Sequence, residues 1–100
     1  MVGFKISVKA AEDFENIWLY TFENWSKNQA DRYINLIFAE IEYLAQNPLV
    51  GKDMRQVRKN YRCSKVKSHL IFYRTSEKNS EIEIIRILHQ RMDIESRLGD

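Results

Sequence analysis

One apolar run near the end of the chain limits the folds that this sequence can adopt. Between residues 82 and 88, every position but two is isoleucine or leucine, and polar residues follow at His89, Gln90 and Arg91. A half-buried strand alternates apolar and polar residues, whereas a run this apolar is typical of a strand covered on both faces. We therefore expect residues 82–88 to form an internal strand, with the polar cluster at its end.

The first part of the chain predicts one strand followed by two helices. Alternating polarity over residues 3–8 predicts a half-buried strand. From Ala10 the apolar spacing changes to steps of three and four, which predicts an amphipathic helix ending near residues 24–25. Ser26 and Gln29 then form a Ser-x-x-Gln capping box, so a second helix begins with almost no linker. The two helices are expected to form an antiparallel hairpin.

The second predicted helix carries an apolar stripe and ends at the only proline. Its apolar residues recur about every 3.5 positions, so one face can pack along the first helix. The members of the stripe are Ala30, Tyr33, Ile34, Ile37, Ile41 and Leu44. Asn47-Pro48 closes this helix, because a residue before proline disfavours the α region. Residues 48–60 are predicted to form the main loop.

The second half of the chain predicts a small antiparallel meander. Polar residues at 76–80 form a turn between its last two strands. The tail could add one or two helical turns, with Met92 and Leu98 facing inwards. The predicted strands cover residues 61–67, 70–75 and 82–88. The sequence therefore predicts one α+β domain over residues 1–100, in the order β-α-α-β-β-β with a short C-terminal helix.

Composition agrees with a single soluble domain. One hundred residues, of which 44% are apolar, can fill a modest core. The sequence has no run of eighteen apolar residues, and its start alternates in polarity where a signal peptide needs a continuous apolar stretch. We expect a cytoplasmic protein. Cys63 is the only cysteine, which excludes an internal disulfide and a thiolate-rich metal site.

Charge divides unevenly between the two halves of the chain. Residues 1–50 carry four Lys/Arg and seven Asp/Glu, whereas residues 51–100 carry twelve Lys/Arg and seven Asp/Glu. The net charges of the two halves are therefore −3 and +5. Most of the excess lies between Lys52 and Arg74. An anionic partner would meet this half first, although a solvated basic face that keeps the protein soluble explains the same pattern.

Several kinds of chemistry find little support in the sequence. His69 and His89 lie on different predicted strands without a metal-ligand spacing, so no metal site is expected. Cys63 has no base beside it in sequence, and a free cysteine in a strand is usually packed. The isolated glycines form no phosphate-binding loop. We therefore expect no cofactor, and no sequence-specific nucleic-acid binding, because no strand carries an RNA-reading aromatic pair.

Several conspicuous side chains also have a structural interpretation. Arg74 and Arg86 can cover the sheet with their aliphatic stems. Trp18 and Trp25 are more simply explained as core residues than as a recognition surface. The acidic residues near the start of the first helix are expected on its exposed face: Glu12, Asp13 and Glu15.

The whole chain nevertheless resembles the ParE branch of the ParE/RelE toxins, the small toxin subunits of bacterial type II toxin-antitoxin pairs. The most specific piece of the resemblance is RILHQRMD, in which a strand ending in Arg-x-Leu-His is followed by Arg and Asp. The other pieces are Asn-Pro-x-x-Gly at 47–51, Tyr-Arg at 61–62 and HLIFYR at 69–74. The resemblance implies a non-enzymatic protein that poisons DNA gyrase and a cognate ParD-like antitoxin that binds it in a hetero-oligomer.

The resemblance, taken with the charge pattern, also suggests two sets of binding residues. The strand end and tail are expected to contact the target through His89, Gln90, Arg91, Asp93 and Arg86. The basic sheet and the groove beside the helix hairpin are expected to bind the antitoxin through Lys65, Lys67, Arg62, Arg74, Trp18, Ile37 and Ile41. An antitoxin segment disordered by itself would place apolar anchors in the groove and acidic groups on the sheet.

Two other functions stay open at this point. RelE-like relatives cut messenger RNA in the ribosome, and Lys65 and Lys67 resemble the paired lysines of that branch. After Arg91 this chain lacks the late tyrosine or histidine that the nuclease branch uses for proton transfer, so only His89 could replace it. A degenerate toxin that retains antitoxin binding alone is the other alternative.

Overall fold

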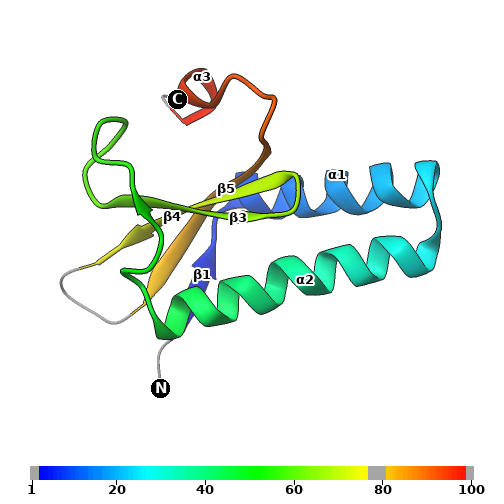
Figure 1. Cartoon of the computed structure of the whole chain (residues 1–100), viewed down its shortest axis with the longest axis horizontal. Helices are drawn as coiled ribbons and strands as arrows, with labels where there is room; N and C mark the ends of the chain where they lie inside the picture. Colours follow the sequence, from blue (N-terminus) through cyan, green and yellow to red (C-terminus); the bar gives the residue numbers. More distant parts are fainter. Residues whose placement is uncertain (1–2, 77–80, 99–100) are drawn as a thin grey trace.

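A computed structural model of the chain describes residues 3–76 and 81–98 and confirms the predicted α+β fold (Figure 1). Figure 1 shows the two long helices side by side as a hairpin, with the short C-terminal helix apart from them. None of the described helices is long and apolar enough to cross a membrane. The bounds of the elements are Phe4–Ile6 (β1), Val8–Asn24 (α1), Lys27–Gln46 (α2), Lys52–Asp53 (β2), Tyr61–Val66 (β3), His69–Thr75 (β4), Ile82–His89 (β5) and Ile94–Leu98 (α3).

The strands form one sheet in the order β1-β5-β4-β3-β2. Strands β3, β4 and β5 make the predicted antiparallel meander. Strand β1 joins it parallel to β5, with Phe4 opposite Ile82. Strand β5 therefore has a neighbour on each side, as its apolar sequence predicted. A register shift between Phe72 and Tyr73 interrupts the ladder between β4 and β5.

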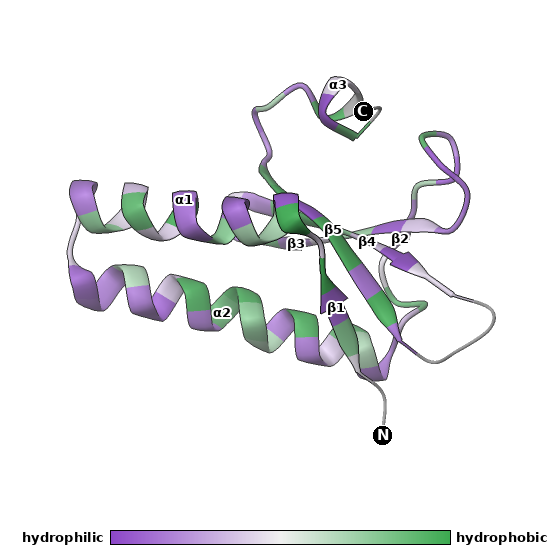
Figure 2. Cartoon of the chain, turned by 180° about the vertical axis from the view of Figure 1, so that it is seen from behind, coloured by the Kyte–Doolittle hydropathy of each residue, from purple (hydrophilic) through white to green (hydrophobic). Residues whose placement is uncertain are grey.

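Both faces of the sheet are covered, which explains why most positions of β5 are apolar. On one face, Tyr73, Ile84 and Ile87 pack with the buried stripe of the helix hairpin. On the other face, Phe72 and Leu88 pack against Leu98 of α3 and against two residues of the main loop, Met54 and Val57. Figure 2 shows the apolar residues of β5 running through the centre of the fold, while polar residues alternate along the outer sides of the helices.

The helix boundaries follow the signals in the sequence. Ser26 caps α2 by accepting a hydrogen bond from the Gln29 amide at 3.1 Å, which confirms the start predicted from the capping box. Helix α2 ends at Gln46, before Asn47-Pro48, as predicted. The start of α1 differs from the prediction. Ser7 accepts from the Ala10 amide at 3.0 Å and caps the helix, so β1 stops at Ile6 and Val8 lies exposed in the first helical turn.

Three further details correct the prediction. The main loop contains a two-residue strand, β2, that pairs with β3 at the sheet edge. Strand β3 stops at Val66, because Lys67 adopts a positive φ of 53° in the turn to β4. The tail does form a helix and buries Leu98, but Met92 is 40% exposed and does not face inwards. The predicted turn at 76–80 falls largely outside the described residues.

Candidate functional site: the end of strand β5 and the helix hairpin

The strand-end segment, residues 89–93, turns away from the sheet on backbone hydrogen bonds. The amide of Gln90 donates to the carbonyl of Ser68 at 2.9 Å, which ties this end of β5 to the turn between β3 and β4. The Arg91 amide donates to Nδ1 of His89 at 3.1 Å. The side chains of Gln90, Arg91 and Asp93 are exposed and His89 is half-buried. Four of the five predicted target residues thus lie together on an accessible edge.

The fifth predicted target residue, Arg86, is engaged inside the protein. Its guanidinium donates two hydrogen bonds to the Asp13 carboxylate, at 2.8 and 3.0 Å, and the two side chains are only 14% and 11% exposed. The same carboxylate accepts the Ile87 amide at 2.9 Å, where β1 no longer covers the edge of β5. The prediction that Arg86 contacts a target therefore needs correction, and so does the prediction that Asp13 is exposed.

The loop of residues 47–53 is fastened to the sheet by Tyr73 and Arg62. The hydroxyl of the buried Tyr73 donates to the Pro48 carbonyl and accepts from the Gly51 amide, both at 2.9 Å. A Cβ on Gly51 would lie 2.8 Å from Cε1 of the Tyr73 ring, so only glycine fits. This contact gives the Asn-Pro-x-x-Gly motif a structural explanation.

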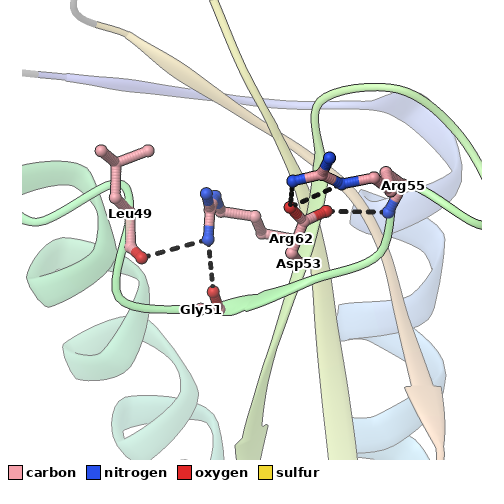
Figure 3. Close-up of polar contacts among 5 residues, drawn as sticks. All are labelled: Leu49, Gly51, Asp53, Arg55 and Arg62. Atoms are coloured by element: carbon pink, nitrogen blue, oxygen red, sulfur yellow. Dashed lines mark hydrogen bonds and ion pairs between the residues drawn. The ribbon is translucent and has the colours of Figure 1, made fainter.

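Arg62 closes the same loop from the other side (Figure 3). Its Nη1 donates to the carbonyl of Leu49 at 3.1 Å and to that of Gly51 at 2.7 Å. Beside it, the Asp53 carboxylate accepts three hydrogen bonds from Arg55. These bonds hold the pKa of Asp53 below its usual value. Arg62 is thus part of a loop clamp, although its sequence position suggested an antitoxin contact.

The other residues predicted to bind an antitoxin are distributed over both sides of the sheet. Alternation along β3 places exposed Lys65 on the same face as Cys63, the face that α3 partly covers. Arg74 is exposed on β4 and forms an ion pair with Glu83 on β5, while Lys67 lies in the neighbouring turn. Trp18 is half-buried on the helix hairpin, where its indole N–H donates to Asp31 at 2.9 Å.

Two members of that predicted set need correction. Ile37 and Ile41 are fully buried between the helix hairpin and the sheet, where they pack in the larger core cluster. Their side chains offer no surface to a partner in this structure. The periodicity that made them conspicuous is the periodicity of a core-facing stripe.

An apolar groove nevertheless runs along the helix hairpin. It has a volume of about 470 Å³ and is lined by Ile6, Ala11, Phe14, Glu15, Trp18, Ile34 and Phe38. Two of the lining residues, Phe14 and Phe38, stack with ring centroids 4.5 Å apart. The groove therefore provides an apolar surface beside Trp18, and its only charged lining residue is Glu15.

The sheet also brings together two histidines that the sequence gave no reason to pair. His69 and His89 are opposite each other on β4 and β5, and their ring centroids lie 5.3 Å apart. The Tyr33 hydroxyl is 2.6 Å from Nδ1 of His69. Burial, reinforced by the neighbouring His89, lowers the pKa of His69 to about 4. The two histidines meet because of the register between β4 and β5, and no local sequence pattern reveals that register.

The described residues contain no cluster of three or more side chains suited to hold a metal ion. Cys63 is half-buried, and burial raises the pKa of its thiol to about 11, against a small opposing effect of Lys52. A thiol with this pKa is protonated at neutral pH and therefore a poor nucleophile.

Comparison with known proteins shows the family of this chain. Residues 4–94 match the family described as the ParE toxin of type II toxin-antitoxin system, parDE. The chain is 35% identical over 99 residues to "Toxin ParE1" of Caulobacter vibrioides, which covers 99% of this chain and 100% of that protein. It is 34% identical over 95 residues to "Toxin ParE1" of Mycobacterium tuberculosis, covering 95% and 96% of the two chains.

A solved structure shares the fold. It is described as "Chromosomal ParDE TA system from P. aeruginosa", and it superposes with a TM-score of 0.74 at 20% sequence identity. The match covers 89% of this chain and 96% of the other. The family match and the curated relatives, each spanning nearly the full length, show that this chain belongs to the ParE family of type II toxin-antitoxin toxins.

Proposed function

We propose that this ParE-type toxin acts without catalysis by binding DNA gyrase through the strand-end segment, so that gyrase stays attached to cleaved DNA. The observation that carries the proposal is the segment itself. It presents Gln90, Arg91 and Asp93 on an exposed edge beside the half-buried His89, and two backbone amides anchor it: that of Gln90 to the Ser68 carbonyl and that of Arg91 to the His89 ring. Exposed polar side chains on a rigid support suit recognition of a large partner.

A plasmid assay tests the gyrase proposal. Purified gyrase, ATP and toxin released from its antitoxin are mixed with plasmid, and supercoiling and trapped double-strand breaks are scored. We expect breaks with the wild type and at least about tenfold fewer with Arg91→Ala, as for truncation of an interface hot spot. Arg32→Ala removes an exposed arginine from α2 and is the matched control. Absence of breaks with folded wild-type toxin would contradict the proposal and direct the search to ribosome-bound messenger RNA.

The second part of the proposal is that an antitoxin inhibits the protein by direct binding. The apolar groove beside Trp18 can bind apolar side chains of an antitoxin segment that is disordered by itself. Acidic residues of the same segment would meet Lys65 and the neighbouring turn at Lys67. Because Lys65 lies on the opposite face of the sheet from the hairpin, such a segment would have to pass around the sheet edge.

Two substitutions separate the apolar contribution from the charged one. Ala11→Glu puts a carboxylate into the groove without removing a core side chain, and we expect it to weaken antitoxin binding by about tenfold or more. Asn16→Glu changes an exposed position on the same helix and should have little effect. Lys65→Glu should weaken binding less, and mainly at low salt. Equal affinities for wild type, Ala11→Glu and Lys65→Glu would contradict this route for the antitoxin.

Expression without the antitoxin tests whether the chain is still toxic. Growth arrest that depends on Arg91 would support the gyrase proposal. Normal growth with soluble, folded protein present would instead favour a degenerate toxin that only binds its antitoxin.

A further inference from the structure

A second hollow lies where the linked ends of the helix hairpin extend past the sheet. Figures 1 and 2 both show α1 and α2 continuing beyond the turn between β3 and β4. The hollow below them has a volume of about 450 Å³, within the range of small-ligand sites. Its lining comes from both helices and from the sheet: Tyr20, Thr21, Trp25, Gln29, Tyr33, Ser68, His69 and His89. We call this hollow the overhang pocket.

The sheet side of the overhang pocket is polar and is held in place by contacts between elements. Tyr33 of α2 reaches His69 of β4 at 2.6 Å, and the His69 ring meets the His89 ring edge to face. The Gln90 amide bonds to the Ser68 carbonyl and joins the two sheet ends that contribute to the pocket. These contacts hold the polar groups of the sheet side in fixed positions.

The helix side of the overhang pocket carries aromatic rings that are exposed and not packed in the core. Trp25 is 74% exposed and Tyr20 is 65% exposed, so the prediction that Trp25 is a core residue needs correction. Large exposed aromatic side chains beside a pocket suit stacking on a planar ligand.

The chain places two cationic residues next to the lining of the overhang pocket. None of the lining residues is Asp or Glu, although the charge of Asp13 acts on the lining residue His69. Lys67 precedes the lining residue Ser68, and the Arg91 amide is bonded to the lining residue His89. Neither Lys67 nor Arg91 takes part in an ion pair with another of the residues that the structure describes. Lys67 and Arg91 therefore add positive charge next to residues of the sheet end of the pocket, although neither lines it.

We propose that the overhang pocket binds a nucleotide, with its base on the rings of Trp25 and Tyr20 and its phosphate toward Ser68, His89 and the adjacent cations. Stacking accepts any base, and a phosphate complements Lys67 and Arg91. The same chemistry occurs in a free mononucleotide and in an unpaired nucleotide of a single strand. This site would read no sequence, and it does not depend on the gyrase proposal.

NMR titration of the isotope-labelled toxin tests the proposal and separates the two sources. The probes are adenosine monophosphate, uridine monophosphate and a four-nucleotide single strand. We expect saturable shifts at the Trp25 indole N–H and at residues 68–69 and 89–91. Shifts with the mononucleotides would assign the pocket to free nucleotides, and shifts with the oligonucleotide alone would assign it to a strand. No saturable shift with any probe, or shifts outside these residues, would overturn the proposal.

Variants give the titration its controls. Trp25→Ala should weaken binding by about fivefold or more, and Trp25→Phe should restore much of the affinity because a ring is retained. His89→Ala should weaken binding through the phosphate. Tyr43→Ala removes another exposed aromatic ring, 52% exposed on α2 and outside the pocket lining, and should leave the affinity unchanged. Equal nucleotide affinities for the wild type and Trp25→Ala would contradict stacking of the base on Trp25. The titration measures nucleotide binding and not gyrase poisoning, so the absence of nucleotide binding would not contradict the gyrase proposal.

Discussion

The loop of residues 47–53 and the strand-end segment of residues 89–93 carry the two most recognisable motifs of this sequence, but the structure uses them in opposite ways. The loop is closed by the Tyr73 hydroxyl and the Arg62 guanidinium, so its motif residues are engaged inside the protein. The strand-end segment is supported by its backbone and leaves most of its polar side chains exposed. A recognisable motif can therefore preserve a shape or present a surface, and only the contacts distinguish the two.

The largest effect on stability is expected at the ion pair between Asp13 of α1 and Arg86 of β5. Asp13→Ala would leave the Arg86 charge and the Ile87 amide unpaired in a largely buried place, so we expect a loss of about 3–5 kcal/mol in the free energy of unfolding. Urea denaturation measures it. Glu12→Ala, at the exposed neighbouring position, should change stability by less than about 0.5 kcal/mol. Similar losses in both variants would mean that the ion pair does not hold α1 to β5.

The next effect concerns the loop. Gly51→Ala would force a methyl group against the buried Tyr73 ring and disturb two hydrogen bonds, which should cost about 3 kcal/mol. Thermal unfolding followed by circular dichroism would show it. Gly3→Ala is the matched control, because the nearest neighbouring atom would lie 3.9 Å from the added Cβ. A Gly51→Ala protein as stable as the wild type would show that the loop is not clamped in solution.

A smaller, pH-dependent effect is expected at the base of the strand-end segment. The folded-state pKa of His69, about 4, is below the ordinary value of 6.5 because the ring is buried beside Tyr33 and His89. The unfolded chain therefore binds a proton more readily, so stability should be complete above pH 6.5 and fall as the pH drops toward 4. Solvent screening reduces the expected loss to about 1–2 kcal/mol.

Denaturation at several pH values measures this dependence. His69→Gln should flatten the curve between pH 6.5 and pH 4, the two values that bound the shift. His89→Gln keeps the titrating ring and should retain most of the slope. Superimposable curves for His69→Gln and the wild type would rule out His69 as the source. Asp13, whose charge opposes the shift, stays in place in both variants.

The smallest effect on stability is expected within the strand-end segment itself. The Arg91 side chain is exposed and its backbone amide makes the contact to His89, so Arg91→Ala should change the free energy of unfolding by less than about 0.5 kcal/mol. In the plasmid assay of the proposed function, the same variant should give far fewer trapped breaks than the wild type. If it were strongly destabilised, the loss of activity would report on folding, and the contrast between the two regions would disappear.

Local patterns predicted the helices and the main strands because each has its own signal. Ser26 and Gln29 marked a cap, Pro48 marked an end, and the apolar run of β5 marked a strand covered on both faces. Strand β2 was missed because two residues are too short to show a period.

The contacts around the candidate sites depend on distant parts of the chain, and local patterns did not predict them. Arg86 and Asp13 are 73 positions apart, so neither residue reveals the other in the sequence. The pairing of His69 with His89 depends on the register of β4 and β5, which includes an irregularity between Phe72 and Tyr73. The exposure of Trp25 depends on how far the hairpin extends past the sheet. A charged residue inside an apolar run, such as Arg86, is nevertheless a usable hint that a buried partner exists.

The parallel pairing of β1 with β5 also bears on when this protein can become active during its synthesis. Residues 4–6 acquire their neighbours only when residues 82–84 have been made, so the sheet joins the beginning of the chain to its last strand. Contacts of such high sequence separation close a long loop, which slows folding. A nascent or truncated chain that lacks β5 has neither the completed core nor the strand-end segment. If the strand-end segment carries the proposed function, an interrupted translation product should lack that function.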